Sequence, residues 1–153
     1  MRESLSLSSP PVATLRDRRG AAGAAMSSVL LSAVLLVAAV VDQAGGQSLV
    51  DHATAVYAPY GKEPDPNLLY GLVYTVAAVD ALLSLLVFRA VRAHRLSAPI
   101  LAVTTVVVTA ALAVLLLATT EYGAQIFPPV WGVLALLPAA AGVVTSALLL
   151  RRR

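Results

Sequence analysis

The chain contains no cysteine among its 153 residues, and it carries little charge. Without cysteine it can form neither a disulfide nor a thiolate metal site. Charged residues make up 12% of the chain and hydrophobic residues 59%. Soluble domains usually carry about 25% charged residues, and a chain this short cannot cover a globular surface with half that share. The composition therefore excludes an ordinary soluble domain.

Charge is absent altogether between Ser97 and Thr120 and again between Val130 and Leu150. A helix needs about 20 apolar residues to cross a hydrocarbon core of ~30 Å, and two further apolar runs complete a set of four. We therefore expect an all-α integral membrane protein. It would be a four-helix bundle over residues 22–153, with spans at about 22–42, 66–90, 98–120 and 130–150.

The segments outside these spans are polar. Residues 1–21 show no hydrophobic periodicity and are expected to form a disordered cytoplasmic tail. The loops 43–65 and 121–129 connect spans on the opposite side. In the longer loop, apolar residues at helical spacing follow Ser48, and Asp51 completes a Ser-x-x-acid capping box. This pattern predicts a short helix lying at the membrane surface.

Two spans begin with recognisable start signals. Asp65 is a suitable N-cap for the second span, and Pro66 fits the first helical position, where a missing N–H costs nothing. Ser97 stands in the same place before the third span. We expect both side chains to cap their helices.

The first span has two further interpretations. Arginines before an apolar stretch are also typical of a signal peptide. Asp42 would occupy position −3 of the nearest cleavage site, so an uncleaved anchor is expected. Met26 offers an alternative start, which leaves open whether residues 1–25 are translated.

Basic residues lie almost entirely on one side of the predicted spans. Lys62 is alone on the other side, and this bias predicts cytoplasmic termini in a plasma (inner) membrane. The same placement explains the net charge of +3, so the bilayer and not nucleic acid is the expected partner. Arginine in place of lysine, with much alanine and valine, is typical of a high-GC bacterial genome. The arginines are Arg2, Arg16, Arg18, Arg19, Arg89, Arg92, Arg95, Arg151, Arg152 and Arg153.

The fourth span carries a stripe of small residues at spacings of three and four. Small residues let helix backbones approach closely in a membrane, where hydrophobicity does not drive association. We interpret the stripe as a packing face, and Pro138 beside it predicts a kink. Thin helices that enclose little space also favour a homo-oligomer or a complex with another membrane subunit. The stripe comprises Gly132, Ala135, Ala139, Gly142 and Ser146.

Asp80 is the acid that falls within a predicted span. An aspartate near the bilayer centre costs roughly 2.5–3.5 kcal/mol on insertion scales, and no span offers a basic residue to neutralise it. One interpretation is a protonated carboxyl that donates a hydrogen bond between helices. The other is a carboxyl that faces a hydrated cavity and exchanges protons or cations. Ser84 lies one turn further on the same face and extends the candidate site.

Acidic and aromatic residues gather at the other side of the predicted membrane. Asp42, His52, Glu63 and Glu121 are weak candidates for binding a divalent or organic cation. The favoured interpretation is that acids are tolerated outside and that the aromatics, Trp131 among them, form an interfacial belt. We predict no metal site and no cofactor.

Several enzyme classes lack their residues. His52 and His94 fall on opposite sides of the membrane, which excludes a bis-histidine haem within one chain. No span contains the histidine that an intramembrane serine protease would need. The chain has neither a P-loop, a GxGxxG nor an HExxH motif. We predict no catalytic residue and do not expect an enzyme.

The four-helix outline is similar to that of the small multidrug transporters, which place a membrane-embedded glutamate in their first helix. Here the acid is Asp80, in the second span, so no site residue is carried over. The layout also resembles DoxX-like membrane proteins in helix count. The first hypothesis is a non-catalytic helical-bundle or interaction protein. The alternative is a proton- or cation-coupled transporter of a small cationic or lipophilic compound that uses Asp80. A lipid enzyme ranks last, because only hydroxyls such as that of Tyr74 could assist Asp80.

Overall fold

The computed structural model describes residues 12–151, and it is almost entirely helical. Four of its helices are long and apolar enough to cross a membrane, which confirms the expected number. Each has at least 21 residues, and about 20 residues of helix are needed to cross a hydrocarbon core of ~30 Å. The long helices are α1 (Val12–Val41), α3 (Pro66–Arg92), α4 (Ala98–Ala118) and α5 (Pro129–Leu150).

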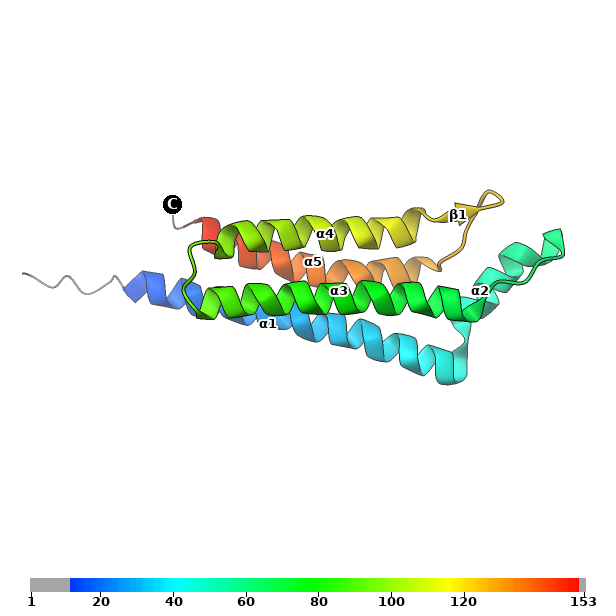
Figure 1. The fold of residues 1–153 in the computed structure, drawn as a ribbon, viewed down its shortest axis with the longest axis horizontal. Helices are drawn as coiled ribbons and strands as arrows, with labels where there is room; N and C mark the ends of the chain where they lie inside the picture. Colours follow the sequence, from blue (N-terminus) through cyan, green and yellow to red (C-terminus); the bar gives the residue numbers. More distant parts are fainter. Residues whose placement is uncertain (1–11, 152–153) are drawn as a thin grey trace, which may run out of the picture.

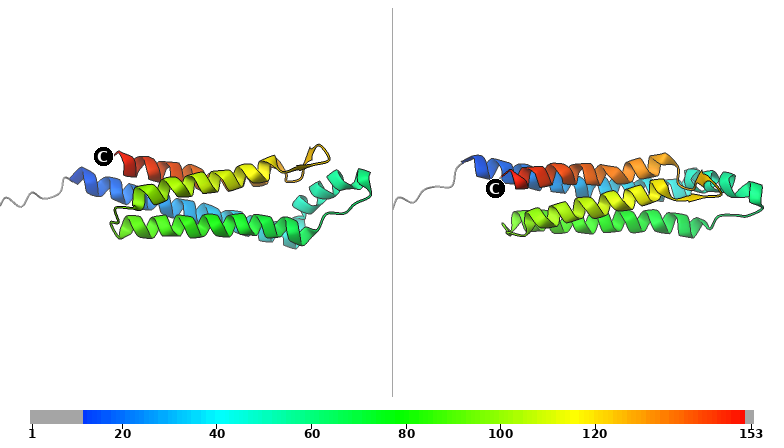
Figure 2. Two further views of the ribbon diagram at one scale, coloured as in Figure 1. Left: turned by 45° about the horizontal axis from the view of Figure 1, so that its top comes forward. Right: turned by 90° about the horizontal axis from the view of Figure 1, so that it is seen from above.

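The four long helices form an up-and-down bundle (Figures 1 and 2). Each packs mainly against two neighbours: α1 against α3 and α5, and α4 against α3 and α5. The contact between α4 and α5 is among the most extensive, and the bundle diagonals are the least used. Short connections and alternating directions are the usual solution for four helices that share one interior.

The first helix is longer than expected. α1 begins at Val12, not near residue 22, so residues 12–21 are helical and the prediction of a disordered tail is wrong for them. Residues 1–11 lie outside the described chain. The alanines and arginines of this stretch are good helix formers, and Ala21 and Ala25 are buried against the other helices. Segments upstream of Met26 therefore contribute to the bundle.

Three short helical elements lie at one end of the bundle. A π-helical turn (Asp42–Gly46) leads into α2 (Ser48–Tyr57), which a 3₁₀ turn (Ala58–Tyr60) follows. The short helix was expected, but it slants away beyond the bundle end and does not lie across it (Figure 1). Leu49 and Ala53 on its apolar side are fully buried against the bundle, which explains this direction.

The second loop at this end contains a hairpin that hydropathy did not predict. β1 (Thr120–Glu121) pairs antiparallel with β2 (Ala124–Gln125). The two residues between them, Tyr122 and Gly123, have φ values of 54° and 79°. Two consecutive positive φ angles are typical of a tight type I′ turn.

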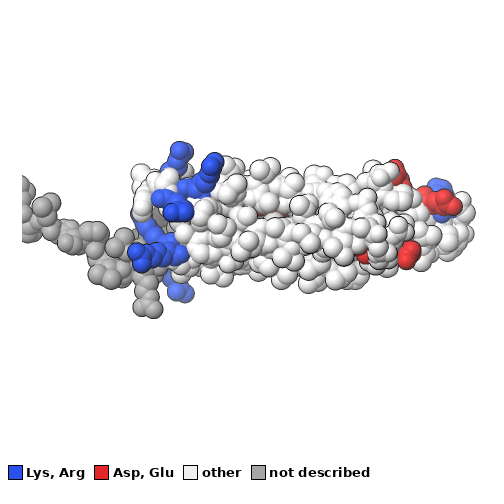
Figure 3. All heavy atoms as spheres, turned by 90° about the horizontal axis from the view of Figure 1, so that it is seen from below, with Lys and Arg blue, Asp and Glu red and all other residues white. Residues whose placement is uncertain are grey.

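Charge divides the molecule into two ends separated by an apolar surface (Figure 3). We call the end with Arg18, Arg89, Arg92, Arg95 and Arg151 the arginine end. The end that carries Asp42, Asp51, Glu63, Asp65 and Glu121, together with Lys62, is the acidic end. The halves of the bundle on either side of Asp80 take the same names below.

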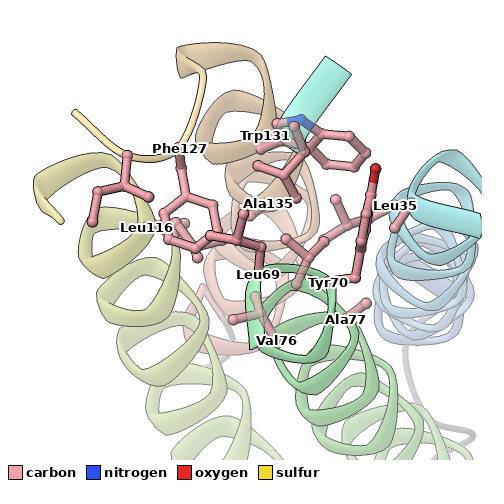
Figure 4. Packing of buried hydrophobic residues seen from close by; sticks show 14 of the residues in the cluster. Leu35, Leu69, Tyr70, Val76, Ala77, Leu116, Phe127, Trp131 and Ala135 are labelled. Carbon is pink, nitrogen blue, oxygen red and sulfur yellow. The ribbon is translucent and has the colours of Figure 1, made fainter. Parts of the chain in front are cut away.

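The acidic half has a core of large side chains (Figure 4). Phe127 lies between Leu116 of α4 and Leu69 of α3, and Trp131 and Tyr70 lie on the side of α1. Phe127, Trp131 and Tyr70 are each at most 3% exposed. The prediction that Trp131 belongs to an interfacial aromatic belt is therefore wrong.

The arginine half has a separate core made of smaller side chains. Ala21, Ala90, Ala98 and Ala102 are buried there together with Val87, Val91 and Leu149. Phe88 is partly buried against this cluster and stacks with the guanidinium of Arg92, whose Cζ lies 5.6 Å from the ring centroid. No other aromatic side chain of the described chain lies in this half, so the packing there depends on close helix approach.

Candidate functional site

Asp80 is buried completely inside the bundle, close to the midpoint of α3. Neither of its carboxyl oxygens has a hydrogen-bond partner among the described residues. At 1.5 Å per residue it lies about 14 Å along α3 from Arg89 and about 15 Å from Tyr70. A buried carboxylate without a partner is very costly, so burial favours the neutral acid. Asp80 is thus an ionisable side chain that is buried inside the bundle although no contact with another described residue explains its presence there.

Ser84, one turn from Asp80 on the same face of α3, belongs to a short line of hydrogen bonds across the bundle. Its hydroxyl oxygen lies 2.8 Å from that of Ser28 in α1. Ser28 in turn donates to the carbonyl oxygen of Pro138 in α5, at 2.8 Å. Because Ser28 has a single proton and gives it to Pro138, Ser84 is the donor in the first bond. Two buried hydroxyls therefore link three helices.

A small cavity of about 10 Å³ lies beside this line. One hydroxyl from each long helix borders it, and the rest of its wall is small or apolar. The hydroxyl of Thr105 is buried and has no partner, whereas that of Thr145 donates to the carbonyl of Ala141 at 3.1 Å. The lining residues are Ala25, Ser28, Ser84, Val87, Ala102, Thr105, Gly142 and Thr145.

The small-residue stripe of α5 packs against α4. A Cβ placed on Gly132 would overlap the side chain of Leu117, and one on Gly142 would come within 2.8 Å of Val106. Ala135 and Ala139 are buried and Gly142 is half-buried. Ser146 is also buried, and its hydroxyl donates to the carbonyl of Gly142 at 3.0 Å. The stripe thus allows the close α4–α5 contact, and Gly142 also borders the cavity.

Asp42 has a structural task at the acidic end. Its carboxylate accepts hydrogen bonds from the backbone N–H groups of Ser48 and Leu49, at 3.0 and 3.1 Å, and from the Ser48 hydroxyl at 2.6 Å. The Tyr70 hydroxyl also donates to it, at 2.8 Å. Asp42 therefore caps α2. The predicted capping box does not form, because the residue before Ser48 adopts a left-handed conformation that directs the chain toward Asp42.

Two other predicted caps have different outcomes. Asp65 accepts from the backbone N–H of Asn67 at 2.9 Å and caps α3 as expected. Ser97 occupies the N-cap position of α4 but makes no side-chain capping bond. Its backbone is in the right-handed helical region, where the hydroxyl is not directed at the free N–H groups.

The other acidic-end candidates connect two loops. His52 in α2 donates through Nε2 to the carbonyl of Gln125 in β2, at 3.1 Å. Tyr57 donates to Glu121 across the same gap. Glu63 is exposed at the far tip. Within residues 12–151 no three His, Asp or Glu side chains come close enough together to hold a metal ion, so these candidates do not form one site.

Tyrosines reinforce the link between the loops. The rings of Tyr60 and Tyr122 stack with centroids 4.1 Å apart, and Tyr57 meets Tyr122 edge-on at 5.7 Å. Lys62 donates to the Tyr122 hydroxyl at 2.7 Å. The hydrogen bond to Glu121, followed by burial, raises the pKa of Tyr57 to about 12. These contacts give Tyr57, Tyr60, Lys62, Glu121 and Tyr122 a structural role in joining the two loops.

Sequence reasoning assigned no site role to the hydroxyls that border the cavity on α1, α4 and α5, although the Thr105 hydroxyl was expected to bond its own backbone or a neighbouring helix. A signal was present, because serine or threonine pairs four residues apart lie in α1 and α4, as Asp80 and Ser84 do in α3. Each pair occupies one face of its helix near mid-length. The pairs are Ser28 with Ser32 and Thr105 with Thr109.

Comparison of the chain with models of protein families, with curated proteins and with solved structures finds no match. The arguments about function therefore rest on the geometry around Asp80.

Proposed function

We propose that the chain is a four-span integral membrane protein of the plasma or inner membrane, with its arginine end in the cytoplasm. Four sufficiently long apolar helices support insertion. The apolar surface between two charged ends has the form expected for a layer of lipid (Figure 3). Cytoplasmic loops retain arginine and lysine, and in the described chain Lys62 is the single lysine or arginine at the acidic end.

We further propose that the protein is a proton-coupled carrier of a small cationic or lipophilic compound, and that Asp80 binds the proton. The observation that carries this proposal is the complete burial of Asp80 with both oxygens unpartnered. A carboxyl that served to join helices would donate to an acceptor on a neighbouring helix, and the described residues provide none. Intramembrane acids that are not paired usually serve ion or proton pathways.

The second candidate is a non-catalytic bundle that interacts with another membrane protein. The closeness of packing favours it, because the cavity of about 10 Å³ has room for one water and not for an organic compound. A carrier must therefore open between helices to admit its cargo. An interaction protein, in contrast, needs no second conformation of the bundle.

Transport measurements with Asp80→Asn distinguish the two candidates. Proteoliposomes contain a pH-sensitive dye and carry an imposed pH gradient. Ethidium, an organic cation, is then added outside. The wild type should take up ethidium and release protons, Asp80→Asn should do neither, and Asp51→Asn, an exposed aspartate on α2, should match the wild type. If the wild type and Asp80→Asn behave alike, the carrier proposal is overturned and the interaction protein is favoured.

Asp80→Leu tests the same proposal through stability. Replacing an unpartnered buried polar group by an apolar one is neutral or stabilising, so this variant should unfold at the wild-type temperature or above it while losing proton coupling. A hydrogen bond between helices would give the opposite result. A fall in the unfolding temperature, measured in detergent by circular dichroism, would show that Asp80 holds the helices together.

A further inference from the structure

The bundle differs on the two sides of Asp80 along its axis. Towards the acidic end, α3 runs about 15 Å from Asp80 to Tyr70 through residues packed in the large-residue core, including Val73, Val76 and Ala77. Towards the arginine end, the next turn reaches Ser84 and the cavity. A route for water or protons is therefore shorter and more polar from the arginine end.

Beyond the cavity, the arginine end contains a wider hollow of about 370 Å³. Basic side chains of Arg18, His94 and Arg95 contribute to its wall. We call this hollow the vestibule. Its size admits many water molecules, since one water in the liquid occupies about 30 Å³.

One helical turn separates the vestibule from the cavity. On α3 the lining passes from Val91 to Val87, on α4 from Ala98 to Ala102, and on α5 from Leu149 to Thr145. Four residues of helix correspond to about 6 Å. The partition is thus one layer of small or medium-sized side chains, which needs only a small movement to admit a water molecule.

The cavity has the polar groups that a buried water requires. A water needs a volume of about 10–15 Å³ and two to four polar partners. The cavity offers about 10 Å³ and a hydroxyl from each of the four long helices. The Thr105 hydroxyl is buried without a partner, although buried hydroxyls are normally hydrogen-bonded.

We propose that the cavity binds one water molecule, and that this water and the surrounding hydroxyls carry protons to Asp80 from the vestibule at the arginine end. A hydronium ion in the vestibule gives a proton to the cavity water and is left as water, and the cavity water passes one of its own protons to Ser84. Ser84 gives its original proton to the carboxylate of Asp80. Each hydroxyl ends with the proton count it began with, and only Asp80 gains a proton. Rotation of the Asp80 and Ser84 side chains spans the turn between them.

Charged groups do not interfere near Asp80. α4 and α5 carry no titratable residue, and those of α1 and α3 in the described chain lie towards the helix ends. Asp80 therefore titrates against hydroxyls and apolar side chains. The remaining titratable residues of these two helices are Arg16, Asp17, Arg18, Arg19, Tyr70, Tyr74, Arg89 and Arg92.

The inference rests on the proposed proton binding at Asp80, and hydrogen–deuterium exchange of that carboxyl tests it. The infrared band of the protonated Asp80 carboxyl is identified by subtracting the spectrum of Asp80→Asn from that of the wild type. This band should shift when protein in nanodiscs is moved into heavy water. Thr105→Val, which keeps the shape but removes the hydroxyl, should slow this shift about tenfold, the effect of one lost hydrogen bond. Thr109→Val is the matched control, because the Thr109 hydroxyl bonds to its own helix and does not line the cavity.

A second measurement finds the side of entry. Because the chain has no cysteine, a single introduced cysteine can be modified selectively with a bulky thiol reagent. Modification of Leu96→Cys, an exposed residue that lines the vestibule, should slow the exchange, and modification of Glu63→Cys at the acidic end should not.

The outcomes separate the inference from the proposed function. If the band shifts at the wild-type rate in Thr105→Val, or if only Glu63→Cys slows it, the cavity pathway is overturned while proton binding at Asp80 stands. If no band distinguishes the wild type from Asp80→Asn, Asp80 does not carry a proton and both proposals fail. Circular dichroism of each variant verifies that it is folded, and Ser84→Ala provides a second removal of a cavity hydroxyl.

Discussion

The acidic and arginine halves of the bundle are built on the same four helices but are packed in different ways. In the acidic half, Phe127, Trp131 and Tyr70 fill the interior and leave a continuous apolar core. In the arginine half, alanines and valines bring the helices close, and hollows remain beside Ser84 and around Arg95. Equal hydropathy along a helix therefore does not imply equal packing along it.

This contrast gives the two halves different tasks. Large, interlocked side chains resist rearrangement, because a core at crystal-like density has few alternative arrangements. Small side chains with unfilled space permit local movement and hydration. Asp80 lies at the boundary between the two cores and is itself fully buried.

The strongest test of the contrast removes one large side chain from each half. Phe127→Ala should cost about 3–5 kcal/mol of stability, because it leaves a large void in a filled core. Leu149→Ala should cost about 2 kcal/mol, the low end for leucine, because its space opens into the vestibule. Unfolding in detergent by increasing denaturant measures both. If the two variants lose the same stability, the halves do not differ in packing.

A smaller loss of stability is expected when a methyl group is added to a glycine in the α4–α5 contact. Gly132→Ala places a methyl group against Leu117 and should cost about 1–3 kcal/mol by overpacking. Gly71→Ala is the control, because no atom lies within 4 Å of the added Cβ. That variant should be neutral or slightly stabilising, since alanine favours helix over glycine. Thermal unfolding measures both variants. If Gly132→Ala and Gly71→Ala unfold at the same temperature, the close α4–α5 contact is contradicted.

The smallest effect concerns the tyrosine link at the acidic end. The pKa of Tyr57, raised from 10.0 to about 12 by Glu121, means that its contribution to stability is complete below pH 10 and is lost as the pH rises through about 12. Glu121→Gln should move the pKa of Tyr57 back towards 10. Ultraviolet absorbance of tyrosinate measures the titration, and Tyr57→Phe identifies its component. An unchanged titration curve in Glu121→Gln would show that the two loops are not joined there.

The four helices could be predicted because hydropathy directly reports a length of apolar chain. Their ends were predicted to within about two residues, apart from the start of the first, where alanine-rich sequence extends α1 back to Val12. Asp80 was also identified from the sequence, because a lone acid in an apolar run requires an explanation whichever way its side chain points. The cap at Asp65 was predicted for a similar reason, because capping depends on residues that are close in sequence.

Features that depend on how the helices rotate against one another could not be predicted. Hydropathy does not distinguish a Trp131 side chain that faces lipid from one that faces the interior, because both environments are apolar. Ser28 and Thr105 are ordinary residues in a membrane helix until the bundle brings them to one cavity. The cap at Asp42 depends on a left-handed residue at position 47, which no pattern in the loop specifies. Such features arise from contacts between segments that are distant in sequence.

The hydrogen bond from Ser28 to Pro138 joins the first long helix to the fourth. During synthesis α1 and α3 can pair as soon as both have been made, and the Ser84 hydroxyl can then reach that of Ser28. The ring closes only when α5, made after the others, inserts between α1 and α4. Until that moment the polar interior of the arginine half faces an open side of the bundle. Assembly of this protein therefore ends with the placement of α5, which completes the interior of the bundle.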